Sequence, residues 1–191
     1  MEQNEALDLY RRTGAYLEGH FRLSSGLHSP GYLQSALVLQ HPADAQSLGA
    51  GIAENVKSVR PTVVLSPALG GLIIGHEVAR ALGVRAIFAE RAGSTALTLR
   101  RGFTLGSGDR VLVVEDVFTT GKSTRETMQV AREAGAEVVG AAAIVDRSGG
   151  AIDFGVPSCV LVQLSVPAYE PEECPLCAQG MALVKPGSRP T

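Results

Sequence analysis

The stretch from Val111 to Thr124 constrains the fold more than any other part of the chain. It begins with four apolar residues, three of them β-branched, which is typical of a strand buried on both faces. Glu115 and Asp116 end that strand, and a turn of hydroxyl residues and glycine follows. Loops at the carboxyl ends of strands in open α/β sheets bind ligands, so this order predicts a binding site at the acid pair.

The turn after the acid pair suits a phosphate. Residues 125–134 predict a helix with Ser123 or Thr124 as its cap, which gathers backbone N–H groups beside the turn. Such helix N-termini and N–H clusters bind phosphate. Two carboxylates instead accept hydrogen bonds from vicinal hydroxyls. The expected ligand therefore has a phosphate at one end and sugar hydroxyls a few ångströms away, as in a ribose 5-phosphate.

Two other interpretations explain this stretch less well. The acid pair alone would fit a solvated strand end, but the Thr-Thr-Gly turn at residues 119–121 then has no explanation. Gly121-Lys122-Ser123 fits a nucleoside-triphosphate P-loop only if a glycine stands five residues before Gly121, and Asp116 stands there.

The stretch resembles the phosphoribosyl-diphosphate (PRPP) binding motif of the type I phosphoribosyltransferases. That motif has an apolar strand, two acids, two variable residues, a Thr-Thr-Gly turn and a nearby hydroxyl residue. The residues that fit it are Glu115, Asp116, Thr119, Thr120, Gly121 and Ser123. The resemblance implies that PRPP binds along residues 115–123, which include Val117, Phe118 and Lys122, and that the two acids are the catalytic residues.

Composition limits the remaining possibilities. The chain has 191 residues, which fits one domain spanning residues 1–191. Its net charge of −2 and the absence of long charged runs argue against a nucleic-acid surface. No apolar run approaches the roughly 20 residues of a membrane span, and the acidic N-terminus is unlike a signal peptide. The cytoplasm is the expected location.

The three cysteines point to no assigned metal site. Cys159 lies in an apolar run and is expected to be buried. Cys174 and Cys177 form a Cys-Pro-Leu-Cys pair, which supplies two of the four ligands of a structural zinc. No second pair or neighbouring histidine completes the set along the chain, so a reduced or redox-sensitive pair is expected ahead of a zinc shared across a dimer.

The segment from Phe21 to Leu33 predicts two short strands, because Gly26, Pro30 and Gly31 punctuate it. Taken alone it fits a surface hairpin. It resembles the N-terminal hood of orotate phosphoribosyltransferases at Phe21, Leu23, Ser25, Gly26, Ser29, Pro30 and Tyr32. The resemblance implies a small hood from about residues 1–40 and part of the C-terminal region, with Tyr32 and Leu33 beside orotate. Family members often carry a lysine where Ser24 stands.

The rest of the chain alternates strands and helices. The pattern predicts helices at residues 5–17, 43–59 and 72–82, and strands at residues 62–65, 85–88, 137–145 and 158–164. Alternation of this kind implies right-handed βαβ units and a parallel sheet. The expected class is α/β, a twisted parallel sheet flanked by helices, and the resemblance implies the type I phosphoribosyltransferase fold.

A tight loop at residues 66–71 follows one predicted strand. Its two glycines let the backbone approach an anion closely, although a plain strand-to-helix turn has the same pattern. By resemblance it is the pyrophosphate loop, which adds PRPP contacts at Ala68, Leu69, Gly70 and Gly71. Related sequences often have a lysine or arginine at the position of Gly70.

Residues 90–108 are the least regular part of the chain. Three arginines in a polar loop near a diphosphate site suit a closing lid, and a solvated hairpin is the alternative. By resemblance this is the mobile catalytic loop, with Arg91 as its leading arginine and PRPP contact. The lysines and histidine usual in that loop are absent, and Arg100 and Arg101 are the cationic substitutes.

Arg147 follows the strand predicted at residues 137–145 and matches the orotate-binding arginine of the family, with Thr119 as a second orotate contact. The resemblance implies transfer of the phosphoribosyl group from PRPP to orotate, in pyrimidine (UMP) biosynthesis. It also implies Mg²⁺ as the cofactor and a homodimer with shared active sites, without nucleic-acid or membrane partners. Two alternatives stay open: a phosphoribosyltransferase for another nucleobase, and a non-catalytic PRPP- or nucleobase-sensing regulator.

Overall fold

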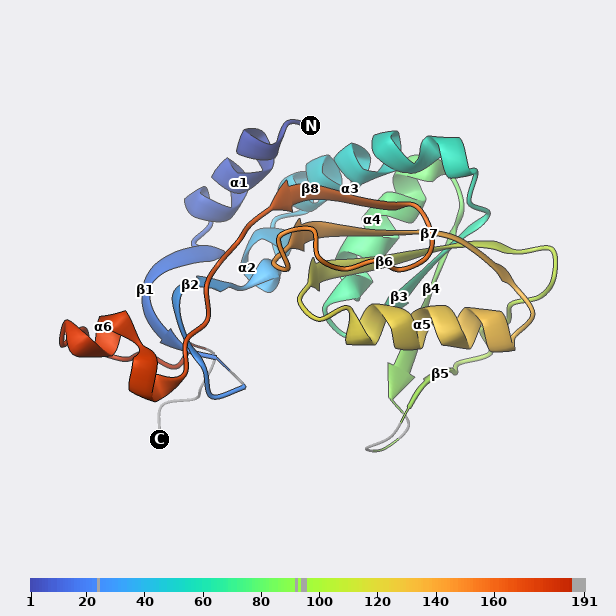
Figure 1. The fold of residues 1–191 in the computed structure, drawn as a ribbon. Coiled ribbons are helices and arrows are strands. Elements are labelled where there is room, and N and C mark those ends of the chain that lie inside the picture. Colours follow the sequence, from blue (N-terminus) through green and yellow to red (C-terminus); the bar gives the residue numbers. More distant parts are fainter. Residues whose placement is uncertain (24, 92, 94–95, 187–191) are drawn as a thin grey trace.

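The computed structural model describes residues 1–23, 25–91, 93 and 96–186. A six-stranded sheet forms its centre, in the order β5-β4-β3-β6-β7-β8 (Figure 1). All neighbours pair in parallel except β4 and β5. The strands are β3 (Val63–Pro67), β4 (Arg85–Arg91), β5 (Leu97–Leu99), β6 (Arg110–Phe118), β7 (Glu137–Asp146) and β8 (Ser158–Gln163). The predicted α/β class with a mostly parallel sheet is confirmed.

Helices cover both faces of this sheet (Figure 1). One face packs against α1 (Gln3–Arg12), α2 (Ser35–Leu39), α3 (Pro42–Val56) and α4 (Gly71–Leu82), and the other against α5 (Lys122–Glu133). A 3₁₀ turn, η1 (Lys57–Val59), follows α3. No helix among the described residues is long and apolar enough to cross a membrane.

The β6 strand owes its central place to its apolar residues. Val111, Leu112, Val113 and Val114 are fully buried, and they alternate between the cores on the two faces of the sheet. Burial of each such side chain stabilises the fold by about 1.5–3 kcal/mol. The strand does not end at the acid pair as predicted: its pairing with β7 continues to Phe118, opposite Asp146.

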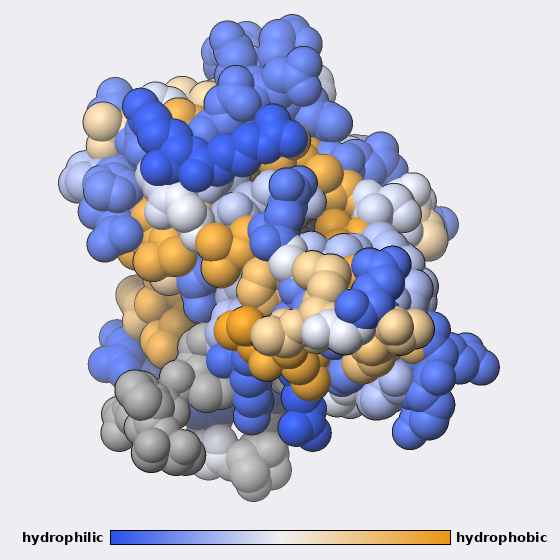
Figure 2. Space-filling view, turned by 90° about the vertical axis from the view of Figure 1, so that its left-hand side faces the viewer, coloured by the Kyte–Doolittle hydropathy of each residue, from blue (hydrophilic) through white to orange (hydrophobic). Residues whose placement is uncertain are grey.

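A second, two-stranded sheet lies beside the main one. It consists of β1 (Tyr16–Arg22) and β2 (His28–Leu33), which pair antiparallel as predicted. The C-terminal segment returns to it through η2 (Pro171–Glu173) and α6 (Pro175–Ala178), so residues far apart in the sequence lie side by side (Figure 1). We call β1, β2 and residues 166–186 the hood. Figure 2 faces this end of the molecule, where apolar surface interrupts the hydrophilic surface.

Backbone hydrogen bonds join the two parts of the hood. The N–H of His28 donates to the Tyr169 carbonyl at 2.9 Å, and the Tyr169 N–H donates back at 2.8 Å. Val184 bonds in the same way to β1, donating to the His20 carbonyl and accepting from Arg22. The C-terminal segment is therefore fixed along both strands of the hairpin.

Several local predictions are wrong. The first helix ends at Arg12 instead of residue 17, because the chain turns at Gly14 with a φ of 68° and enters β1. Glu2 and Glu5 form a capping box at its start. The short helix α2 was not predicted from the sequence. Cys174 and Cys177 lie beside His20 and His28, so the expectation that no histidine accompanies the pair is also wrong.

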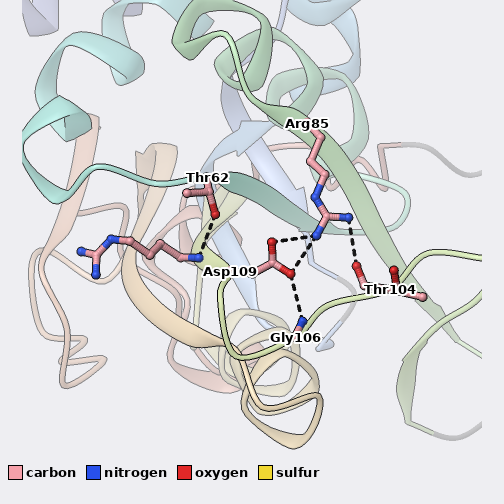
Figure 3. A network of polar contacts seen from close by, with 6 residues as sticks. Thr62, Arg85, Thr104, Gly106 and Asp109 are labelled. Atoms are coloured by element: carbon pink, nitrogen blue, oxygen red, sulfur yellow. Dashed lines mark hydrogen bonds and ion pairs between the residues drawn. The ribbon is translucent and has the colours of Figure 1, made fainter.

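Residues 92, 94 and 95 of the predicted mobile loop lie outside the described residues, and residues 96–109 have more regular contacts than a polar loop. Residues 97–99 pair with the end of β4 as a hairpin, which was the alternative interpretation. Beyond β5, the Arg85 guanidinium binds Asp109 at 2.8 Å and donates to the Thr104 carbonyl, while Asp109 accepts from the Gly106 N–H (Figure 3). These contacts fix the return of the chain to β6.

Candidate active site

Two cavities adjoin at the carboxyl ends of β6 and β7. The larger, of about 510 Å³, lies under the hood and is lined by Arg22, Leu23, Ser25, Tyr32, Thr119, Thr120, Arg147, Val166, Ala168, Lys185 and Pro186. The smaller, of about 350 Å³, is lined by Leu33, Pro67, Ala68, Gly70, Glu115, Asp116, Val117, Thr119, Ser123 and Arg147. Thr119 and Arg147 line both, so a ligand of two parts fits across them.

The acid pair is asymmetric. The Glu115 side chain is buried and accepts a hydrogen bond of 2.7 Å from the Ser123 hydroxyl. Burial, and then the neighbouring charge of Asp116, raise the pKa of Glu115 from 4.5 to about 8. Glu115 therefore keeps its proton to a higher pH than an ordinary carboxyl group, and the Asp116 side chain lines the smaller cavity beside it.

The turn at residues 119–123 leaves a helix start without a side-chain cap. Gly121 is the cap residue, with a φ of 73°, and neither predicted cap acts as one. The Ser123 hydroxyl donates to Glu115 instead. The Thr124 hydroxyl is buried without a hydrogen-bond partner among the described residues. The Lys122 N–H donates a long hydrogen bond of 3.4 Å to the Thr120 hydroxyl, and the start of α5 otherwise presents its N–H groups to an anion.

The loop before α4 lies against the acid pair. A Cβ atom added to Gly70 would stand 2.7 Å from an Asp116 carboxylate oxygen, so the loop backbone touches that side chain. Ala68 and Gly70 line the smaller cavity. Gly71 packs beneath it, and Leu69 points to solvent with 82% of its surface exposed. Of the four predicted contacts, Ala68 and Gly70 face the cavity.

Arg147 lies where the two cavities meet. Its backbone N–H donates to the Phe118 carbonyl at 2.9 Å, which fixes it to the end of β6. Burial lowers the pKa of its guanidinium, which stays positively charged, and the Nε atom has no hydrogen-bond partner in the described part of the chain. A half-buried cation that lines both cavities favours an anionic ligand group at this point.

The remaining predicted site residues differ in whether they line one of the two cavities. Tyr32 and Thr120 line the larger cavity, whereas Leu33 and Val117 line the smaller one. Phe118 instead packs in the core against Phe154, with ring centroids 4.8 Å apart. Gly121 and Lys122 shape the turn without lining either cavity, and Ser24 lies outside the described residues.

The structure does not bring the loop arginines to these cavities. Arg91 forms an ion pair of 2.7 Å with Glu126 on α5. Arg101 binds Glu90 at 2.9 Å, and Arg100 lies 4.0 Å from the same carboxylate. All three lie on or beside the β4–β5 hairpin, and the described parts of both cavities are lined without them.

Two cations that line the larger cavity, Arg22 and Lys185, were not predicted from the sequence. Arg22 ends β1, and Lys185 follows the residue that pairs with β1. Each is an unremarkable surface residue by local pattern. Only the return of the C-terminal segment to the hairpin brings them together, and no short motif encodes that contact.

Comparisons with known proteins agree on one family. A model of the phosphoribosyl transferase domain matches residues 37–154. An orotate phosphoribosyltransferase of Pelotomaculum thermopropionicum is 52% identical over 189 residues, which covers 99% of both chains.

Solved structures agree with the sequence relatives. Orotate phosphoribosyltransferase from Aeropyrum pernix superposes with a TM-score of 0.69 at 29% identity, covering 82% of this chain and 92% of that one. The Mycobacterium tuberculosis enzyme in complex with PRPP gives a TM-score of 0.66 at 25% identity, covering 85% and 89%. The similarity therefore extends beyond the acid-pair motif to the fold of more than four fifths of the chain.

Proposed function

The chain belongs to the orotate phosphoribosyltransferase family, and from this membership we propose that it transfers the 5-phosphoribosyl group of PRPP to orotate. The products are orotidine 5′-monophosphate and diphosphate, so the enzyme serves pyrimidine biosynthesis. The observation that carries the proposal is Arg147, a half-buried cation that lines both the hood-covered cavity and the acid-lined one. Orotate, unlike the other common nucleobases, brings a carboxylate to such a cation.

PRPP is assigned to the smaller cavity and the adjoining turn. The uncapped N–H groups at residues 119–123 suit the 5-phosphate, and the Asp116 carboxylate suits the ribose hydroxyls. The backbone at Ala68 and Gly70 lies beside Asp116, which suits the diphosphate end of the same ligand. These placements extend the family motif residue by residue onto the geometry of this site.

The reaction is a displacement at the anomeric carbon of the ribose. The bond from that carbon to the diphosphate oxygen breaks, and its electron pair leaves with diphosphate. A ring nitrogen of orotate, which has already lost its proton, forms the new bond, so no general base is needed. Positive charge develops on the ribose ring during the step, and the Asp116 carboxylate is placed to stabilise it.

The donor set fits the Mg²⁺ that PRPP chemistry requires. Asp116, Glu115 and Ser123 present oxygen atoms to the smaller cavity, and Mg²⁺ prefers oxygen ligands while keeping several waters. Asp116 would hold the hydrated ion, with the substrate supplying most direct ligands. When bound, the ion neutralises the charge of the departing diphosphate. Asp116 would thus orient both the ribose and the bound Mg²⁺.

Orotate is assigned to the larger cavity. Arg147 would bind its carboxylate, and Thr119, Tyr32 and Leu33 would bound the ring, as the family pattern implies. The two cations that the sequence did not predict, Arg22 and Lys185, also line this cavity. A cavity rich in positive charge favours an anionic base over neutral uracil or a purine.

The active form is proposed to be a homodimer, each chain being a single domain of residues 1–191. Arg91, Arg100 and Arg101 lie on a hairpin away from the cavities of their own chain, which supports a role for them in a neighbouring site. There they would meet the departing diphosphate. The cytoplasm stays the expected location.

The variant Arg147→Ala tests the substrate assignment. We expect the KM for orotate to rise by about 100-fold or more, because an Arg–carboxylate hydrogen bond pair is worth a few kcal/mol, while the KM for PRPP changes little. Arg132→Ala, on the exposed last turn of α5, is the matched control and should behave as wild type. A selective loss of PRPP affinity in Arg147→Ala would refute the assignment.

A further inference from the structure

Four side chains that the proposed reaction does not use converge in the hood. His20 comes from β1, His28 from β2, and Cys174 and Cys177 from the start of α6. Their candidate ligand atoms all lie within 4.8 Å of one another. The two histidines and Cys174 are buried, and Cys177 is exposed at the edge.

The spacing of these atoms is that of a tetrahedral metal site. With Zn–N near 2.0–2.1 Å and Zn–S near 2.3 Å, tetrahedral ligands lie about 3.3 Å apart for two nitrogens and about 3.6 Å apart for nitrogen and sulfur. Here the two ring nitrogens are 3.0 Å apart. The nitrogen–sulfur separations are 3.5 Å and 3.7 Å from His20, and 3.2 Å from His28 to Cys177. These four separations are within a few tenths of an ångström of the tetrahedral values, and all the ligand atoms lie within 4.8 Å of one another, so a small contraction would complete the site.

One histidine is already oriented for ligation. The Nδ1 atom of His20 lies 2.9 Å from the Met181 carbonyl oxygen, which only accepts hydrogen bonds, so Nδ1 carries the proton. The unprotonated Nε2 then faces the other three groups. A backbone carbonyl that fixes the tautomer in this way is the usual outer contact of a metal-bound histidine.

A buried hydrogen-bond network explains the cluster less well. With the His20 proton committed to Met181, its Nε2 faces one ring nitrogen and two sulfurs, yet accepts a single good hydrogen bond. Thiols are weak donors and acceptors, so little is gained by gathering two of them there. Both cysteines are free, which also sets a disulfide aside. A cation with four open coordination positions uses all four atoms.

We propose that His20, His28, Cys174 and Cys177 bind one Zn²⁺ as a closed structural site. Two thiolates and two imidazoles are a ligand set of structural zinc, and they disfavour the hard, oxygen-seeking Mg²⁺. All four positions are filled by the protein, so none is open to a substrate or a catalytic water. The site is complete within one chain and needs no partner subunit.

The position of the cluster gives the metal a structural purpose. It joins the β1–β2 hairpin to α6, two elements separated by about 150 residues of sequence. Beyond α6 the chain pairs with β1 at Val184 and then supplies Lys185 to the larger cavity. Zinc would therefore hold in place the wall of the cavity that faces the substrate base.

Metal content of the purified full-length chain tests the proposal. Expressed with zinc in the medium and dialysed against metal-free buffer, the protein is expected to retain about one zinc per chain by inductively coupled plasma mass spectrometry. Cys177→Ser and His28→Asn should lose most of it. Cys159→Ser makes the same chemical change at a cysteine on β8, outside the cluster, and should keep it.

Cobalt gives a second measurement on the unaltered chain, which decides the matter even if the variants do not fold. Apo-protein titrated with Co²⁺ should develop the intense visible bands of tetrahedral cobalt and a thiolate-to-cobalt charge-transfer band, saturating at about one equivalent. Zn²⁺ should then bleach both. Wild-type protein without zinc and without these bands would overturn the proposal, as would full zinc retention in Cys177→Ser.

Discussion

The buried acid Glu115 makes a prediction about stability and pH. Its pKa is raised in the folded protein, chiefly by burial and then by Asp116. A carboxyl group with a raised folded pKa binds its proton more tightly in the folded state than in the unfolded state. Its stabilising contribution is therefore fully present below the unfolded pKa of 4.5, and it is lost as pH rises toward the folded pKa of about 8.

The size of the effect follows from the shift. Each pKa unit corresponds to about 1.4 kcal/mol, and Glu115 is only 6% exposed, so solvent screens the effect little. The wild-type free energy of unfolding should fall by about 3–5 kcal/mol from this group between about pH 5 and about pH 8. That amount is a large share of the stability of an ordinary domain.

Glu115→Gln isolates this contribution. A glutamine keeps the shape and a carbonyl oxygen that accepts the Ser123 hydrogen bond, but it does not titrate. Urea unfolding at a series of pH values should show the variant gaining stability relative to wild type as pH rises. The control Glu54→Gln removes an exposed carboxylate that pairs with Lys57, and it should keep the wild-type slope.

The pH dependence of the two unfolding free energies can also refute the raised pKa of Glu115. If the wild-type and Glu115→Gln free energies ran parallel across the whole pH range, Glu115 would titrate alike in the folded and unfolded chains. The asymmetry between the two acids would then be wrong.

Three further predictions concern neighbouring positions. Asp116→Asn should lower turnover by about two orders of magnitude or more, with unchanged circular dichroism, because it removes the charge assigned to the ribose; near-normal turnover would remove that role. Gly121→Ala should cost more than about 1 kcal/mol in urea unfolding, because φ is 73° and the new Cβ would lie 2.9 Å from Phe154. Gly106→Ala, with open space around it, is the control, and equal losses in the two would count against the turn geometry. Thr124→Val should raise the unfolding free energy by about 1 kcal/mol, because it removes a buried hydroxyl without a partner, and a loss of stability would mean that the hydroxyl is satisfied.

The parts of the fold that the sequence predicted depend on local patterns. The buried run from Val111 to Val114 identified the central strand, because a strand covered on both faces needs an unbroken apolar stretch. The Thr-Thr-Gly turn located the smaller cavity, since its spacing from the acids is fixed by the strand and helix around it. Both features lie within a few residues of one another.

The missed features depend on contacts between distant segments. Lys185 reaches the larger cavity only because Val184 pairs with β1, and His20 meets Cys174 only because α6 returns to the hairpin. The sequence around the Cys-Pro-Leu-Cys pair therefore shows only two of the four possible ligands, because both histidines lie about 150 residues away along the chain. The predicted caps were wrong for a related reason: α5 begins at Lys122 with Gly121 as its cap residue, and the Ser123 hydroxyl donates to Glu115, a residue of the preceding strand.

An absorbance assay of base specificity tests directly whether the protein is an orotate phosphoribosyltransferase. The purified chain is mixed with PRPP and Mg²⁺, and the absorbance change of the base is followed with orotate, uracil, hypoxanthine, xanthine and adenine in turn. We predict that orotate is the only one of these five bases to react with PRPP, and that the reaction depends on Mg²⁺, because Arg147 selects a carboxylate. Turnover of another base without orotate, or PRPP binding without any turnover, would contradict it.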